Sequence, residues 1–394
     1  MASVHETGQM SSVEQLLRLV DDEIPAALAL REKLHANPEV GFAEFGTARA
    51  IADALPFEPA PVAETGLVAR IGGPRGVLVR AELDGLPIDE ETDSPFAAAN
   101  GFMHACGHDV HLAALVAVTR AAYRMREDLP VPFTAVFQPS EERHPSGAVA
   151  LLDEPALTGG FDAVVAAHLH PLIAWGSIGI EPGAVNAASD AAEILVEGAG
   201  GHGAYPHLAT DPVLALSHVV VALHGLVGRR LDPTHAAALT VGKIEAGTSE
   251  NVIPSRARAW ATLRALDATD QAVLRDAVVS TVEGVAAAHA CTGSVRFTKS
   301  EPPLVNDDDL ARSTAAVAPV AGLAVAPPWR SCGSDDFAHL RRLGPSLMAF
   351  VGLHGAPGFL PRPLHHPEFL PPADSVALVA KTQAVAYLAG ARRG

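Results

Sequence analysis

The sequence predicts an α/β protein, with a catalytic domain built on a central, mostly parallel sheet flanked by helices and a second, smaller α+β domain inserted into it. Short apolar strands alternate with amphipathic helices on both sides of the insertion. Several of these strands end in His, Asp or Glu, and open α/β sheets assemble their sites at such strand ends. Across residues 187–298 the order changes to β-α-β-β-α-β, which is typical of the ferredoxin-like split motif.

The length and composition are those of a globular protein with two domains. A chain of 394 residues with 48% hydrophobic and 19% charged residues supports a large core. The net charge of −17 argues against a nucleic-acid or anionic-membrane partner. Three scattered cysteines suggest no disulfide framework, and we find neither a signal peptide nor an apolar run of about 18 residues. These features favour a cytoplasmic protein without a membrane span.

The catalytic domain is predicted to comprise residues 1–186 and 299–394. Its helices are expected over 13–35, Phe45–Leu55, Asp309–Val317 and Ser375–Leu388. Its strands are expected at Leu67–Ile71, Val77–Ala81, Phe133–Phe137, Phe161–Pro171 and Ser346–Gly352.

The inserted domain has a different pattern. Strands are expected at Ala191–Glu197, Ala238–Ile244, Arg256–Leu263 and Gly293–Phe297, and helices at Pro212–Leu226 and Thr269–Ala288. The strands and helices thus make one split motif of roughly 110 residues.

The most informative stretch is residues 104–111, which packs three imidazoles, a thiol and a carboxylate around Cys106. The apolar run 112–118 predicts a buried helix after it, and Asp109 is a plausible N-cap. A thiolate near a helix N-terminus and beside imidazoles is a good ligand for zinc-like ions. The alternative is a buried structural cysteine with hydrogen-bonded core histidines.

Four further pairs of polar residues lie at the ends of predicted strands or in predicted loops. They are the pairs Glu82 and Asp84, Glu141 and Glu142, His168 and His170, and His365 and His366. Each pair has a functional and a structural interpretation. The acids could orient or bind a metal, or lie on a solvated turn or surface, and the histidines could be ligands, core residues or loop residues.

Together these stretches resemble the dinuclear-metal aminoacylase and carboxypeptidase family of amidohydrolases, in the branch with hippurate hydrolases and auxin–amino acid conjugate hydrolases. The resemblance runs from Leu34–Glu39 to Leu364–Pro367. It is carried by His-Ala-Cys-Gly-His-Asp, Gln-Pro-x-Glu-Glu, Gly-Gly-His and Asn-Val-Ile-Pro in this order.

The resemblance implies a centre of two divalent ions, Mn²⁺, Zn²⁺ or Co²⁺. Cys106 would bridge the two ions. His108 and Glu142 would complete the ligands of one ion, and His168 and His365 those of the other. Such ions lower the pKa of bound water to about 7, so that hydroxide exists at neutral pH.

The resemblance also implies roles for residues outside the ligand set. Glu141 would be the general base, and Asp84 would orient a group bound to metal. His202, His207 and Asn251 in the inserted domain would bind the substrate carboxylate or the oxyanion, either in their own subunit or in the active site of a neighbouring one. That domain would act as a lid and in dimerisation, so a homodimer or higher homo-oligomer is expected.

The predicted activity is metal-dependent hydrolysis of the amide bond of an N-acyl amino acid, releasing a carboxylic acid and a free amino acid. A metallo-dipeptidase or carboxypeptidase is the alternative, because Glu82 or Asp335 could bind the α-amino group of a dipeptide. A non-catalytic metal- or ligand-binding homologue is a further alternative.

The sequence departs from the family pattern at several positions. Glu82 stands where Asp is usual, Arg143–Pro145 replaces a Gly-rich stretch, and Asp335 stands where Glu is usual. His170 and His366 are extra imidazoles that could assist the metal site. Few aromatic residues lie near the motifs in sequence, so an aromatic acyl pocket is not indicated.

Overall fold

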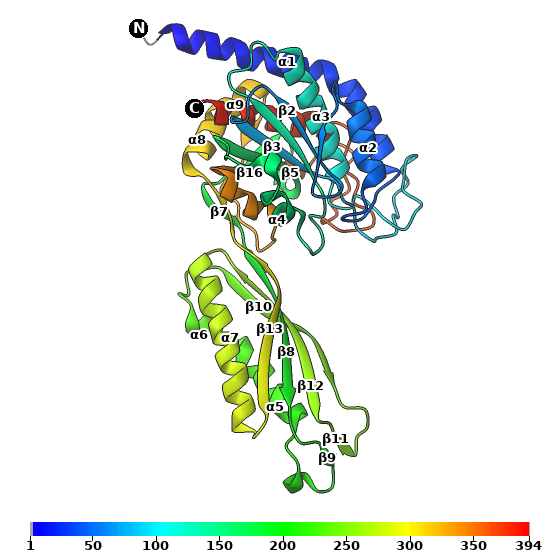
Figure 1. Cartoon of the computed structure of the whole chain (residues 1–394), viewed down its shortest axis with the longest axis vertical. Helices are drawn as coiled ribbons and strands as arrows, with labels where there is room; N and C mark the ends of the chain where they lie inside the picture. Colours follow the sequence, from blue (N-terminus) through cyan, green and yellow to red (C-terminus); the bar gives the residue numbers. More distant parts are fainter. Residues whose placement is uncertain (1–2, 394) are drawn as a thin grey trace. The chain divides into compact units, whose positions relative to one another are not determined.

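The computed structural model describes the backbone of residues 3–393 and the side chains of residues 12–298 and 300–393. The chain forms two compact units (Figure 1). The first runs to Gly183 and also contains Val305–Trp329 and the segment from His339 onward. The second contains Ala184–Leu304 and Arg330–Ala338, a segment that the sequence placed with the catalytic domain.

The first unit is built on an eight-stranded sheet in the order β1-β2-β4-β3-β5-β16-β6-β15. The central strands β4, β3, β5 and β16 are parallel neighbours, whereas β2 is antiparallel to β4 and β6 to β16. The strands are β1 Ala60–Val62, β2 Gly66–Ile71, β3 Val77–Glu82, β4 Phe133–Gln138, β5 Ala163–Ala174, β6 Ser177–Gly179, β15 Ala324–Val325 and β16 Ser346–His354. The predicted mostly parallel sheet is confirmed.

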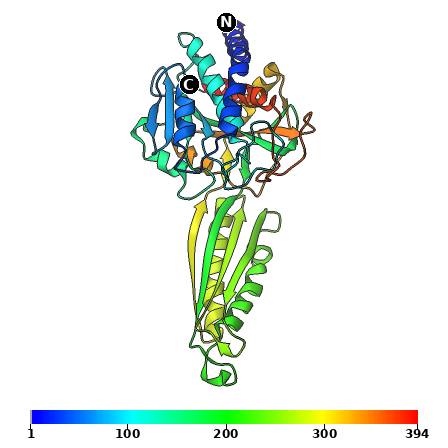
Figure 2. The ribbon, with the colours of Figure 1, turned by 90° about the vertical axis from the view of Figure 1, so that its right-hand side faces the viewer.

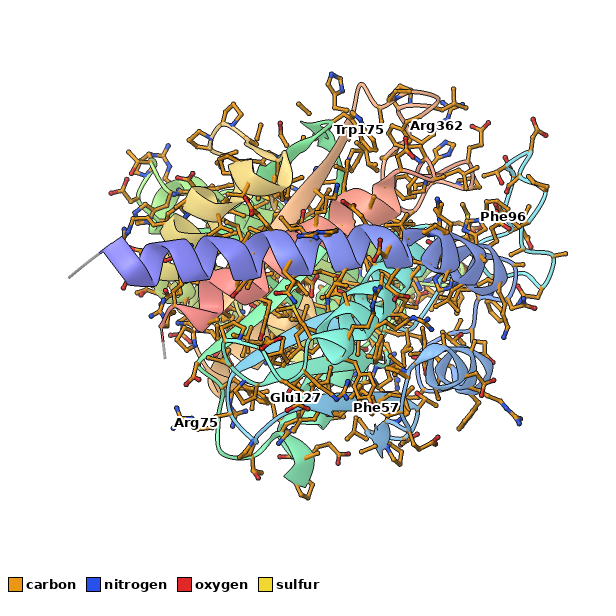
Figure 3. The ribbon with its side chains drawn as sticks, turned by 90° about the horizontal axis from the view of Figure 1, so that it is seen from above. Phe57, Arg75, Phe96, Glu127, Trp175 and Arg362 are labelled. Carbon is orange, nitrogen blue, oxygen red and sulfur yellow. The ribbon has the colours of Figure 1, made fainter. Side chains whose placement is uncertain are left out.

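The helices of this unit are α1 Ser3–His35, α2 Phe45–Ala54, α3 His108–Arg124, α4 Gly147–Leu152, α8 Asp308–Val317 and α9 Ser375–Ala391. Figure 3 looks onto α1, which packs on α3 and α9. Residues 112–118 of α3 are all buried, as expected for a helix that is apolar on every side. The helix is therefore held on all sides, and its N-terminal end has a fixed position.

The start of α3 differs from the prediction. Gly107, not Asp109, precedes the helix, with a left-handed φ of 84°. A Cβ atom at Gly107 would lie 2.9 Å from Leu169 Cδ1, so glycine allows both the turn and the close approach. Asp109 lies in the first turn, where its carboxylate accepts hydrogen bonds from Arg31 and His35 instead of capping the helix.

The second unit contains a four-stranded antiparallel sheet in the order β10-β12-β8-β13, with two helices on one face (Figure 2). Its main elements follow the order β-α-β-β-α-β. They are β8 Ala188–Glu197, α5 Pro212–His224, β10 Ala237–Ala246, β12 Arg256–Ala265, α7 Ala268–Ala288 and β13 Thr292–Glu301. Alternate residues of β8 and β12 face α5 and α7, and form a core of their own.

Short elements complete the chain. They are β7 Gly183–Asn186, β9 Gly201–His202, α6 Val227–Arg230, β11 Val252–Ile253, β14 Leu304–Asn306 and four 3₁₀ turns at Pro155–Leu157, Pro206–Leu208, Ala318–Ala321 and Asp336–Leu343. Within the described part of the chain, no helix combines the length and apolar character that crossing a membrane requires.

Candidate metal centre

The five residues predicted to bind metal come together in the first unit. One ligand atom each from Cys106, His108 and Glu142 lies within 4.8 Å of the others. Cys106 Sγ lies 3.5 Å from His168 Nε2, and Glu142 Oε1 lies 3.1 Å from His365 Nε2. The contacts therefore connect all five side chains, although they come from positions as far apart as 106 and 365 in the sequence.

Backbone carbonyls fix the tautomers of two of these histidines. His108 Nδ1 donates a hydrogen bond to the carbonyl oxygen of Asp84 at 2.8 Å, and His168 Nδ1 donates to that of Leu169 at 2.7 Å. A carbonyl oxygen only accepts, so each Nδ1 must carry the hydrogen. Each neutral ring then presents the lone pair of Nε2, as metal-binding imidazoles do.

The donor atoms fit divalent cations. His108 Nε2 is buried and has no hydrogen-bond partner among the described residues, although a buried polar atom normally has one. Glu142 Oε1 is buried as well and lies beside His365, another proposed ligand. A thiolate, imidazoles and a carboxylate are suitable ligands for Zn²⁺, Co²⁺ or Mn²⁺.

The protein alone shifts the pKa values of these ligands toward protonation in two cases. Burial and the nearby Glu142 and Glu141 carboxylates raise the pKa of the Cys106 thiol well above its usual value. Burial lowers the pKa of His108, but the contact with Asp84 and the charges of Glu82 and Glu142 outweigh it and raise the pKa to about 10. A bound cation would reverse both shifts, so metal binding must release protons.

The two other groups of the predicted chemistry lie beside these ligands. The Asp84 carboxylate accepts the backbone N–H of Glu142 at 2.9 Å and is buried, so the alternative of a solvated turn is wrong. Glu141 Oε2 lies 4.0 Å from His108 Nε2, and only 10% of the Glu141 side chain is exposed. The pair Glu141–Glu142 is therefore part of the cluster, not a surface acidic pair.

Two segments of the cluster have an uncommon backbone conformation. Ser140, just before Glu141, has a φ of 47°, and His365 has a φ of 66°. Positive φ in residues other than glycine is uncommon and clusters at functional sites. At Ser140 the turn is stabilised by hydrogen bonds from its N–H to Glu44 and from its hydroxyl to the carbonyls of Arg143 and Pro145.

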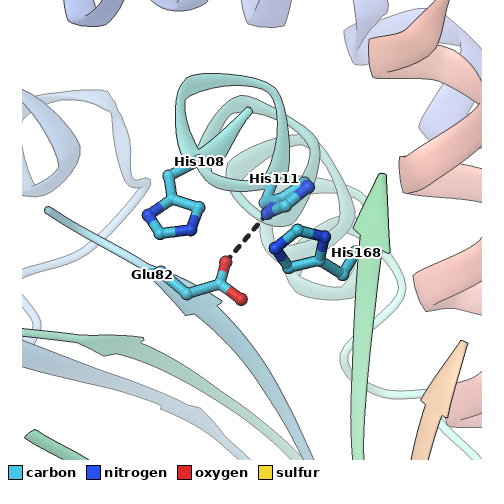
Figure 4. Close-up of side chains that lie close together, drawn as sticks. All are labelled: Glu82, His108, His111 and His168. Atoms are coloured by element: carbon cyan, nitrogen blue, oxygen red, sulfur yellow. Dashed lines mark hydrogen bonds and ion pairs between the residues drawn. The ribbon is translucent and has the colours of Figure 1, made fainter. Parts of the chain in front are cut away.

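Arg80, Glu82 and His111 lie directly behind the ligand cluster. The sequence predicted no role at the site for Arg80 or His111, and offered Glu82 as a group that orients metal or binds an amine. Glu82 and His111 form a buried group with His108 and His168 (Figure 4). Burial raises the pKa of Glu82, but the Arg80 charge and the hydrogen bond from His111 outweigh it and hold the pKa well below its usual value. Arg80 and His111 contact both oxygens of Glu82, so its suggested role in binding a dipeptide amine is wrong.

The two extra imidazoles, His170 and His366, contact residues outside the ligand cluster. His170 stacks on Trp329 with ring centroids 4.2 Å apart, and Trp329 packs on Phe350 at 4.7 Å. His366 accepts the backbone N–H of Glu368. Neither belongs to the groups of metal-binding side chains found among the described residues. The fold brings aromatic rings close to His168 that are distant in sequence, since Phe350 lies 6.4 Å from it.

The predicted substrate-binding residues lie in the second unit. His202 in β9 pairs with Val252 in β11, and the carbonyl of Asn251 accepts the N–H of Gly203 at 2.8 Å. The Tyr205 ring contacts those of His202 and His207, with centroids 5.3 Å and 6.5 Å apart. His202, His207 and Asn251 thus belong to one exposed loop region of this unit.

Comparison with known proteins identifies the family. The model of Peptidase family M20/M25/M40 matches residues 78–387. The chain is 34% identical to the N-acetyl-L-cysteine deacetylase of Bacillus subtilis, over 89% of this chain and 84% of that one. It is 32% identical to the N-acetyldiaminopimelate deacetylase of Halalkalibacterium halodurans, over 92% of this chain and 99% of the other.

A solved structure agrees with these relatives. A Bacillus subtilis protein described as a dinuclear metal-binding peptidase of the M20 family matches with a TM-score of 0.80 and 28% identity, over 94% of this chain and 98% of that one. The predicted assignment to a family of metal-dependent amidohydrolases is thereby confirmed. The chain belongs to Peptidase family M20/M25/M40.

Proposed function

We propose that this protein hydrolyses the amide bond of small N-acyl amino acids, using two divalent ions held by Cys106, His108, Glu142, His168 and His365. The observation that carries the proposal is the convergence of these five side chains around the unpartnered Nε2 atom of His108. When bound, such ions supply a hydroxide at neutral pH and polarise the amide carbonyl.

The residues of the chain divide the remaining tasks. Glu141 accepts the proton of the attacking water and passes it to the leaving amine, a role that suits a carboxylate at the edge of the ligand cluster. Asp84 holds His108 and the backbone of Glu142 in place. His168 presents its Nε2 as a neutral ligand, because burial and the nearby His111 keep its pKa well below the usual value.

The curated relatives direct the choice of substrate. Two of them are named for the deacetylation of N-acetylcysteine and N-acetyldiaminopimelate, which are small acyl amino acids. We propose the same substrate class here. The dipeptide alternative is less well supported, because Glu82, one of the two acids suggested to bind the dipeptide amine, is already paired with Arg80 and His111.

The second unit is proposed to act as a lid and in dimerisation, and to bind substrate through His202, His207 and Asn251. The exposure of its loops around β9 and β11 is consistent with contacts to a ligand or to another subunit. We further propose a homodimer in the cytoplasm, in agreement with three cysteines that are all free thiols.

The test combines elemental analysis with a substrate panel. Wild type and Glu141→Ala are assayed with N-acetylcysteine, other N-acetyl and N-benzoyl amino acids, and dipeptides, and release of the free amine is measured. About two ions per chain, hydrolysis by wild type and loss in the variant with metal retained are expected. Cleavage of dipeptides alone would replace the proposed substrate class, and absence of metal after reconstitution would overturn the proposed site.

A further inference from the structure

We infer that a buried hydrogen-bond relay, which runs from Arg80 through Glu82 and His111 to the backbone of Leu169, positions the imidazole of His168 for metal binding. The inference rests on the proposed metal-dependent function. It assigns a positioning role to three residues that are not themselves proposed ligands. The relay would set the affinity for the ion that His168 and His365 hold.

The relay begins at a fully buried cation. Arg80 is 0% exposed, and its Nε donates a hydrogen bond to Gln138 Oε1 at 2.8 Å. Its Nη1 forms an ion pair with Glu82 Oε1. Arg80 thereby joins the ends of β3 and β4 and neutralises the carboxylate of Glu82, since a buried charge requires a partner.

His111 carries the relay from β3 to β5. Its Nε2 accepts the backbone N–H of Leu169 at 3.0 Å. Because an N–H group only donates, the ring hydrogen must be on Nδ1, which then donates to Glu82 Oε2 at 2.9 Å (Figure 4). Both nitrogens of His111 are used in this way, so His111 is a support and not an additional ligand.

The backbone of Leu169 connects the relay to His168. Its N–H is held by His111, and its carbonyl accepts the hydrogen on His168 Nδ1 at 2.7 Å. The opposite nitrogen of His168 lies 3.5 Å from Cys106 Sγ. A displacement of the Leu169 backbone would therefore move the donor atom of His168 relative to the thiol, and groups behind metal ligands typically contribute 10- to 100-fold in metal affinity.

Two substitutions of His111 separate its two hydrogen bonds. In His111→Gln the side-chain oxygen occupies the position of Nε2 and can still accept from Leu169. In His111→Asn the amide nitrogen occupies the position of Nδ1 and can still donate to Glu82, but Leu169 loses its acceptor. If the relay acts through Leu169, the Asn variant must lose more metal affinity than the Gln variant.

The experiment is a titration of the metal-free full-length protein with Co²⁺, followed by calorimetry and by visible absorption. For His111→Asn we expect one Co²⁺ to bind as in wild type and the second to bind about 10- to 100-fold more weakly, and for His111→Gln a several-fold smaller loss. Tyr387→Phe is the matched control. It removes a buried hydrogen bond to the carbonyl of Val131, outside the relay, and should leave both affinities unchanged.

The outcomes distinguish this inference from the proposed function. A wild type that binds no Co²⁺ would overturn the proposed function itself. Two ions in wild type with equal affinities in wild type and both His111 variants, or equal losses in both, would overturn only the relay. If His111→Asn does not fold, Glu82→Gln serves instead. Its neutral amide cannot accept hydrogen bonds from both Arg80 and His111 with the same oxygen pair as Glu82, so weaker Co²⁺ binding than in wild type is expected, and unchanged binding would contradict the relay.

Discussion

The imidazole of His108 and Asp84 are in contact at two points, 2.8 Å from Nδ1 to the carbonyl oxygen and 3.5 Å from Nδ1 to the carboxylate. The first contact fixes the tautomer of His108. The second places a negative charge beside the ring, which increases the basicity of a metal-binding imidazole. The Asp84 carboxylate also accepts the N–H of Glu142, so one residue orients two proposed ligands of the same ion, through its backbone carbonyl and its side chain.

Replacement of the proposed general base should separate catalysis from metal binding. We expect Glu141→Gln to lower kcat by about 10²- to 10⁴-fold, the usual contribution of a positioned base, while the metal content stays at the wild-type level. Steady-state kinetics and elemental analysis on the same preparation measure both quantities. Glu127→Gln, at a glutamate whose side chain is 85% exposed, is the control and should retain full activity. Wild-type turnover in Glu141→Gln would exclude the role.

Metal binding should release protons and strengthen with rising pH. Without a cation, the pKa of His108 is raised to about 10 and that of Cys106 well above its usual value, so both groups are protonated at neutral pH. Binding must displace both protons, and the apparent affinity should rise by up to about 100-fold per pH unit. Calorimetry in buffers of different ionisation enthalpy counts the protons. Cys106→Ser should release about one fewer, and an unchanged count would show that the thiol is not a ligand.

The buried contacts of His35 predict a pH-dependent stability. Its ring nitrogens lie 3.0 Å from Asp109 Oδ2 and 3.0 Å from Glu90 Oε1. Burial lowers the pKa of His35, but the two carboxylates outweigh it and raise the pKa to about 9. Because the folded pKa exceeds the unfolded value of about 6.5, this stabilisation is complete below pH 6.5 and disappears as the pH rises through 9.

The corresponding measurement is urea unfolding in the presence of chelator, for wild type and His35→Gln, between pH 6 and pH 10. The difference in unfolding free energy between the two proteins should shrink with rising pH by up to about 3 kcal/mol. Subtracting the variant removes the contribution of other groups that titrate in this range. A difference that is independent of pH would show that His35 is neutral in the folded protein.

Glycine at position 107 should be required for two separate reasons. Ala at a left-handed φ costs about 1–2 kcal/mol, and contact with Leu169 should add about 1–3 kcal/mol. Gly159→Ala is the matched control, because Gly159 has a φ of 97° and nothing within 4 Å of an added Cβ. Denaturant unfolding should show a larger loss for Gly107→Ala, with weaker metal binding. Equal losses of unfolding free energy in the two variants would mean that the Leu169 side chain accommodates the added methyl group without an energetic penalty.

The sequence predicted the sheet well, because apolar strands are short local patterns. The proposed ligands came from motifs shared with the family, and the fold brings these five side chains together. The apolar strands are recognisable alone, and the motifs around Cys106 and Glu142 lie on the loops that follow them. The function of Asp109 was mispredicted for the opposite reason. Its partners Arg31 and His35 lie 78 and 74 residues away, so a local capping rule had no information about them.

The relay behind His168 was not predictable for the same reason. Glu82 and His111 are 29 residues apart, and His111 and Leu169 are 58 apart. Only the packing of α3 against β3 and β5 shows that Glu82 is buried and paired. In the sequence, it was an acid at a strand end that could equally have been a solvated turn or a binding group.

The hydrogen-bonded ladder of β4, β3 and β5 bears on the order in which the enzyme folds and binds metal. These strands pair through their backbones and are covered by an apolar core, so we expect the chain to fold without a bound ion. Small zinc domains, in contrast, fold only as they take up metal. We expect this protein to form its metal site before it binds metal. The ion that it binds would then depend on which divalent ions are available when folding is complete.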